Sequence, residues 1–218
     1  MMVRGRQTNG AGTSGSGDHR LRADMGGFLL VDMLVTAAII IVLTVLYYGP
    51  SSKRVQAAKL EMCKRNLEFI HVACQTYAAE NGGKFPAAKG ARTSDVPLSL
   101  LVPRSTTSTE YFTCPSSGDG TLASAKPFAG KRISYAFAMG LSKDAPATQW
   151  LLADALLAPV TNAVGQPIFS STGKKPANNH RDRGGNVMFA DGHAERSPPK
   201  SSVAIEAPAG VVILNPQP

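Results

Sequence analysis

Five residues in the second half of the chain carry imidazole and carboxylate groups, the groups used by metal sites and acid–base catalysts: Asp154, His180, Asp182, Asp191 and His193. Imidazole combined with carboxylate suits Zn²⁺, whereas Asp carboxylates and carbonyl oxygens suit Ca²⁺. Their spacing forms neither an Asp-x-Asp array nor a His-x₃-His pair. Ordinary roles also fit them, since Asp191 can form a turn, His193 can begin a strand and Asp154 can end one. We therefore expect no bound metal at these positions.

Catalytic motifs are missing from the sequence. It contains no Gly-x-Ser-x-Gly, phosphate-binding loop, dinucleotide fingerprint or His-Glu-x-x-His. Asp154 and Asp191 are candidates for an acid–base pair, and His180 could complete a hydrolase with them, but their separation in sequence does not bring them together. We expect no enzymatic activity.

An apolar run near the N-terminus is the strongest pattern. Phe28 to Tyr48 is 21 residues long, and Asp32 is its only charged residue. A helix of this length reaches roughly 30 Å, the thickness of a bilayer's hydrocarbon core. A carboxylate costs about 2.5–3.5 kcal/mol at mid-membrane and less near an end. Asp32 therefore either reaches a headgroup region or meets a positive partner that insertion alone does not supply.

This segment resembles the type IV prepilin signal of pilins and type II secretion pseudopilins. The resemblance lies in a polar, basic leader ending in Gly27, followed by Phe28 and by an acidic residue, Asp32, at the fifth place of an apolar helix. It implies that a prepilin peptidase cleaves between Gly27 and Phe28 and methylates the new amine of Phe28. It also implies that Asp32 registers the subunit by meeting a neighbour's N-terminal amine in the filament. The family usually has Glu where this chain has Asp32, so the charge is kept but the reach is one methylene shorter.

Other motifs resemble pilin-like proteins of a large bacterial family with a C-terminal signature of His followed by Asp-Gly (H-X9-DG). His180 and Asp191-Gly192 match this signature, with ten intervening residues in place of nine. The extra residue is expected within 181–183. Residues 63–67, residues 77–86 and a Cys-Pro at 114–115 match other parts of the family. Major pseudopilins hold Ca²⁺ in C-terminal loops, so the resemblance makes Ca²⁺ the one cofactor to consider.

The three cysteines leave several pairings open. Cys63 and Cys74 are eleven residues apart, which on a helix means one face but about 16 Å of axial separation. A disulfide needs Cα atoms within about 7 Å, so these two cannot pair if the helix forms. Cys114 could pair with one of them. We consider a Cys63–Cys114 disulfide in an oxidising envelope compartment, with Cys74 as a small buried hydrophobe; the alternative is three buried thiols.

A second helix is expected from about Ser52 to Glu80, because Pro50 breaks or kinks the first one. Residues 81–83, Asn-Gly-Gly, form a good C-cap for it. Its apolar residues are spaced by three and four, which places them in one buried stripe: Leu60, Cys63, Leu67, Ile70, Cys74 and Tyr77.

For the rest of the head, the sequence predicts strands and loops. Residues 132–139 alternate large and small side chains, as in a half-buried strand, and the apolar residues 150–154 predict a central strand. Residues 185–195 predict a hairpin with a two-residue turn at Asp191-Gly192. We expect a β-like run at 111–115, an edge strand within 203–214, and a loop over 85–108 with one helical turn near 98–102.

The charge pattern gives little guidance on partners. The formal net charge is +8, but the basic residues are scattered, without an aromatic-interleaved patch, so we expect no nucleic-acid binding. Lys53 and Arg54 follow the apolar run as closely as Arg20 and Arg22 precede it, so the positive-inside rule does not orient the helix. The resemblance implies a cytoplasmic leader and a head outside the cytoplasm.

Together these patterns predict an α+β protein whose long N-terminal helix, with a transmembrane half and an amphipathic half, packs on a small antiparallel sheet. The expected parts are a leader (1–27), a membrane and filament-core helix (28–48), its amphipathic extension (49–84) and a head (85–218). The implied function is a structural subunit of a type IV-like filament, either a type II secretion pseudopilin or a related pilin. Its implied partners are the prepilin peptidase, other subunits and the inner-membrane assembly platform. The alternative is a permanently anchored envelope module that binds an anionic or polysaccharide ligand.

Overall fold

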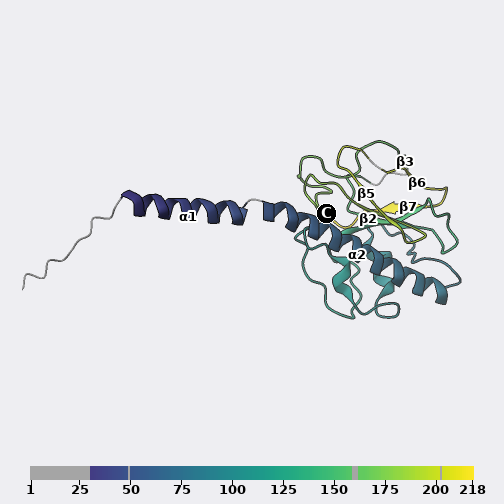
Figure 1. The fold of residues 1–218 in the computed structure, drawn as a ribbon. Coiled ribbons are helices and arrows are strands. Elements are labelled where there is room, and N and C mark those ends of the chain that lie inside the picture. The colour runs from purple at the N-terminus through teal and green to yellow at the C-terminus, as the bar shows by residue number, and fades with distance from the viewer. Residues whose placement is uncertain (1–29, 49, 159–161, 202) are drawn as a thin grey trace, which may run out of the picture. The chain divides into compact units, whose positions relative to one another are not determined.

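The computed structural model of the chain describes residues 30–48, 50–158, 162–201 and 203–218 (Figure 1). The chain divides into two units, the first ending at Tyr47 and the second beginning at Tyr48.

Helix α1 (Leu30–Tyr48) makes up nearly all of the described part of the first unit. Its 18 residues Leu30–Tyr47 have a mean hydropathy of 2.5 and none of them is buried. Among the described helices, this is the one that is long and apolar enough to cross a membrane.

The second unit begins with helix α2 (Pro50–Glu80). Pro50 takes the first helical position, where its missing N–H and fixed φ are tolerated. Gly82 and Gly83 end the helix with positive φ, and the Gly83 amide donates to the Ala78 carbonyl at 2.8 Å. The predicted stripe is confirmed: Leu60, Cys63, Leu67, Ile70 and Cys74 are buried, and Tyr77 is partly buried against the core.

Five strands form one antiparallel sheet in the order β5-β4-β2-β1-β7. Helix α2 packs against β4 and β2. The strands are β1 (Tyr135–Met139), β2 (Trp150–Asp154), β4 (Gly185–Phe189), β5 (Ala194–Ser197) and β7 (Val212–Leu214). The described residues are therefore α+β, with an apolar N-terminal helix and a small antiparallel sheet, as the sequence predicts.

The position of β2 confirms the predicted central strand, and β7 is the predicted edge strand. The prediction for residues 132–139 is partly wrong. The strand begins only at Tyr135, and both of its faces are buried, because Ala136 and Ala138 are as inaccessible as Tyr135 and Phe137. Small residues on the second face allow other segments to cover it, so alternating size here does not mean alternating exposure.

The hairpin between β4 and β5 forms at Asp191-Gly192, but its loop is longer than predicted. The Phe189 amide donates to the His193 carbonyl at 2.9 Å, and the Gly192 amide donates to the Phe189 carbonyl at 3.0 Å. Only Gly192 takes a positive φ, +93°, while Asp191 does not. This is a three-residue loop with glycine in the left-handed position, not a two-residue turn.

Short elements complete the unit. The predicted β-like run at 111–115 is wrong, because Thr109–Phe112 forms the 3₁₀ helix η2. The helical turn expected near 98–102 lies a little earlier, as α3 and η1. The remaining elements are α3 (Asp95–Leu98), η1 (Ser99–Leu101), β3 (Asn162–Ala163) and β6 (Ile205–Glu206), of which β3 and β6 pair separately from the main sheet.

Candidate functional site

The first candidate site is helix α1 with its single charge. Asp32 lies in the first turn, where a carboxylate is stabilised by the positive end of the helix dipole. The hydroxyl of Thr36 donates to the carbonyls of Asp32 and Met33, at 2.9 and 3.0 Å, and that of Thr44 donates to the Ile40 carbonyl at 2.7 Å. These hydroxyls are satisfied within the helix, as a bilayer requires. None of the described Lys, Arg or His side chains forms an ion pair with Asp32.

The predicted processing site, Gly27 and Phe28, lies outside the described residues. Cleavage and methylation there therefore stay predictions from the sequence.

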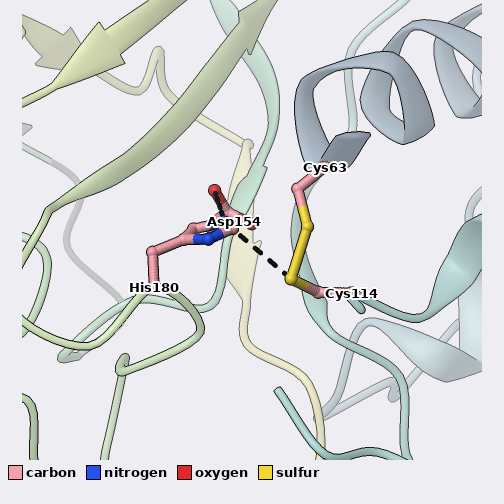
Figure 2. Close-up of side chains that lie close together, drawn as sticks. All are labelled: Cys63, Cys114, Asp154 and His180. Carbon is pink, nitrogen blue, oxygen red and sulfur yellow. Dashed lines mark hydrogen bonds and ion pairs between the residues drawn. A yellow bond between two sulfur atoms is a disulfide. The ribbon is translucent and has the colours of Figure 1, made fainter. Parts of the chain in front are cut away.

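A second candidate site is buried in the head, where four segments meet (Figure 2). Cys63 on α2 forms a disulfide with Cys114, which follows η2. His180, from the loop before β4, lies with its Nε2 3.2 Å from the Asp154 Oδ2 and 3.8 Å from the Cys114 Sγ. The four residues are 0–3% exposed. We call this group the Cys–His–Asp cluster.

Asp154 is the polar centre of this cluster. Its Oδ2 accepts from the Asn186 backbone amide at 2.7 Å and from the Asn186 side chain at 3.2 Å. The side-chain amide of Asn186 also donates to the Leu60 carbonyl at 3.0 Å, and this bond links the sheet to α2. These bonds compensate the burial of the carboxylate, which would otherwise be strongly unfavourable. Among the described residues, the second ring nitrogen of His180, Nδ1, is buried without a hydrogen-bond partner.

The negative charge of Asp154 is also felt by a neighbouring phenol. Burial raises the pKa of Tyr135, and the Asp154 charge raises it further. The side-chain amide of Asn66 donates to the Tyr135 hydroxyl at 3.0 Å and partly opposes this increase in pKa. Tyr135 is therefore a neutral core side chain at physiological pH, not an acid–base group.

The structure divides the sequence's metal-ligand candidates into two groups. Asp154 and His180 meet in the Cys–His–Asp cluster, whereas Asp191 and His193 pair on the exposed hairpin loop. Asn186, beside Asp154, and Phe189, where the hairpin loop begins, are three residues apart on β4, which is about 10 Å along the strand. Asp182 is exposed and belongs to neither pair. From the sequence, Cys63 and Cys114 were either a disulfide or buried thiols, and nothing in it indicated that their sulfurs lie beside Asp154 and His180.

The Asp191-Gly192 half of the signature contacts α2 at a different place. His71 on α2 makes a hydrogen bond of 3.0 Å between its Nε2 and the Ala190 carbonyl. A Cβ at Gly192 would lie 3.0 Å from the His71 ring. Ala190 and Gly192 therefore contact α2 at His71, whereas His180 lies beside the disulfide through which Cys63 links α2 to Cys114.

A cleft of about 490 Å³ lies on the head, between the loops around Asn179 and the C-terminal residues 215–218. Arg132 and Asp119 line it and form an ion pair of 3.5 Å. Lys175 also lines it and forms no ion pair with a described acidic residue. The cleft therefore combines apolar residues and amide groups with two basic side chains, one of which is paired with Asp119.

No family model, curated protein or solved structure matches the chain.

Proposed function

We propose that this chain is a structural subunit of a type IV-like filament, a type II secretion pseudopilin or a related pilin. The observation that carries the proposal is α1, a fully exposed apolar helix whose only charge, Asp32, stands five residues into the segment that follows Gly27. An exposed helix of this kind needs either lipid or other helices around it. A filament supplies both in turn, first the inner membrane and then a bundle of like helices.

The mechanism is mechanical. Prepilin peptidase removes the leader, and α1 holds the subunit in the inner membrane with the head outside the cytoplasm. The assembly platform then moves α1 into the bundle, where the methylated amine of Phe28 on a neighbouring subunit neutralises Asp32. Because that pair forms only between subunits, the insertion cost of Asp32 favours assembly over the isolated membrane state.

Helix α2 offers a second contact between subunits. Val55, Met62, Phe69 and Val72 are half or more exposed, although all are large and apolar. The first three are spaced by seven residues, the repeat by which helices pack along one another. Phe69 also stacks on Tyr111, with ring centroids 4.1 Å apart, which fixes its orientation. In the proposed filament this face packs against a second copy of the chain.

The test of the proposal is assembly of Asp32 variants in a host that carries the peptidase and platform. Asp32→Asn removes the charge at nearly constant size, and we expect at least a tenfold lower filament yield. Asp32→Glu restores the charge and should assemble, and Thr36→Val is a matched control on the same helix. Normal assembly of Asp32→Asn would contradict the proposed pairing.

The cleft on the head supports a second candidate, an anchored module that binds an anionic ligand. Here α1 would remain a permanent membrane anchor and Lys175, with Arg132, would hold the ligand. Binding of dextran sulfate that is weakened by Lys175→Gln, but not by Lys200→Gln on the exposed surface away from the cleft lining, would favour this function. An uncleaved N-terminus in the same preparation would complete the case for it.

A further inference from the structure

The Cys–His–Asp cluster has the donor set of a structural zinc site. Two sulfurs, one imidazole nitrogen and one carboxylate oxygen all lie within 4.8 Å of one another. Cys₂His sites completed by a carboxylate fall within the ligand types that Zn²⁺ accepts, and a closed four-ligand site is typical of structural zinc. The ligands come from four separate segments, so a metal here would tie α2 to the sheet and its loops.

The distances in the oxidised protein already approach those of a metal site. With usual zinc bond lengths, a tetrahedral centre holds its donors about 3.3–3.8 Å apart. The His180 Nε2 lies 3.2 Å from the Asp154 Oδ2 and 3.8 Å from the Cys114 Sγ. The other donors lie within 4.8 Å of one another, and the two sulfurs, which the disulfide now holds in a covalent bond, would have to separate. The disulfide is thus what keeps the cluster from offering four free donors.

The surroundings of the cluster also suit a bound cation. Asp154 is held by Asn186 through its backbone and side-chain amides, the kind of outer hydrogen bonding that orients a metal-binding carboxylate. The Nδ1 of His180 has no hydrogen bond to a described residue, so rotation of the ring toward a metal breaks none there. Without a metal, two buried thiols beside Asp154 would stay protonated, and a bound cation would balance the charge of the thiolates that form when it binds.

We propose that reduction of the Cys63–Cys114 disulfide converts this cluster into a Zn²⁺ site made of Cys63, Cys114, His180 and Asp154. A dithiol reductant supplies two electrons and two protons, so the S–S bond breaks, two thiols form and the reductant becomes a disulfide. Zn²⁺ then displaces both thiol protons to solvent. His180 binds through the Nε2 lone pair while its proton moves to Nδ1, and Asp154 binds through Oδ2. Disulfide and zinc are alternative cross-links at one place, and neither depends on the filament function.

The experiment compares zinc uptake by the oxidised and reduced full-length chain in detergent. The protein is reduced with dithiothreitol, freed of it without oxygen, incubated with Zn²⁺ and desalted, and its metal content is measured by mass spectrometry. We expect about one Zn²⁺ per reduced chain and essentially none per oxidised chain. Co²⁺ in place of Zn²⁺ should give the thiolate charge-transfer band and the visible absorption of a tetrahedral site.

Variants distinguish this site from adventitious thiol binding. His180→Gln and Asp154→Asn should each weaken Zn²⁺ binding by at least about tenfold in the reduced state. Cys74→Ala and His193→Gln are the matched controls, because they remove a thiol and an imidazole outside the cluster, and both should bind normally. Circular dichroism of the oxidised variants, whose disulfide is intact, checks that they fold.

Three results would overturn the proposal. The first is a folded, reduced chain that takes up no zinc. The second is uptake that is unchanged by His180→Gln and Asp154→Asn. The third applies if reduction alone unfolds the head. In that case the proposal is overturned if Zn²⁺ fails to restore the near-ultraviolet circular dichroism of the head.

Discussion

Loss of the Cys63–Cys114 disulfide should remove a large part of the stability of the head. The two cysteines are 51 residues apart in sequence. Closing a loop of that length in the unfolded chain gives about 4 kcal/mol of stabilisation at 25 °C in the chain-entropy treatment. Domains of this size have a total free energy of unfolding of about 5–15 kcal/mol. The Cys63→Ala/Cys114→Ala protein should therefore stay folded with about 1–11 kcal/mol of its free energy of unfolding left.

Urea unfolding in the presence of EDTA measures this loss. Trp150, the chain's only tryptophan, is 1% exposed in the central strand β2, so its fluorescence reports opening of the core. With a urea dependence of about 2 kcal/mol/M, the midpoint should fall by about 2 M. Cys74→Ala is the control, since it removes a buried thiol from the same helix without opening a loop, and should cost about 1 kcal/mol. A double variant as stable as the native chain, or no less stable than Cys74→Ala, would refute the reasoning.

Three further predictions concern the signature and the free thiol. Gly192→Val should lower stability by about 2–3 kcal/mol in thermal unfolding, because of the +93° φ and the His71 ring 3.0 Å from the new Cβ; an unchanged melting temperature would contradict the contact. The His193 backbone amide lowers the pKa of Asp191, and the His193 side chain lowers it further. This contact therefore stabilises the folded protein above the ordinary carboxyl pKa, and the stabilisation is lost as the pH falls through the lowered pKa. An Asp191 pKa at or above the ordinary carboxyl value, measured by an NMR titration, would contradict this prediction. Burial raises the pKa of Cys74, so iodoacetamide should modify this thiol only after unfolding; rapid modification of the folded protein would show that the thiol is accessible.

The local elements were largely readable from the sequence because their signals are local. The stripe from Leu60 to Cys74 has helical spacing, and one helix face suffices to define it. Trp150 to Ala153 is apolar throughout, which suits a strand covered on both faces. Asp191-Gly192 marked the hairpin, although the loop length depended on a hydrogen bond between Phe189 and His193 that the dipeptide alone does not determine.

The cluster was not readable, because it is a product of tertiary packing. Cys63, Cys114, Asp154 and His180 are separated by 51, 40 and 26 residues in sequence, in that order. No motif encodes that spacing, and the meeting of four segments depends on how α2 lies against β2 and β4. Likewise, η2 lies where an extended run was expected, and its last residue, Phe112, is buried against Phe128 of a distant loop, with ring centroids 4.5 Å apart. One informative signal was available: a buried strand ending in a charged residue, Asp154, requires partners for its carboxylate.

The central claim, that the chain is a processed filament subunit, is tested most directly by its N-terminus. The protein should be purified from membranes of a host that carries prepilin peptidase, and its intact mass and N-terminal sequence determined. We expect a chain that begins at N-methylated Phe28. A chain that retains Met1, or that begins near Ala57 beyond the apolar helix, would contradict it and leave the anchored binding module or a released head in its place.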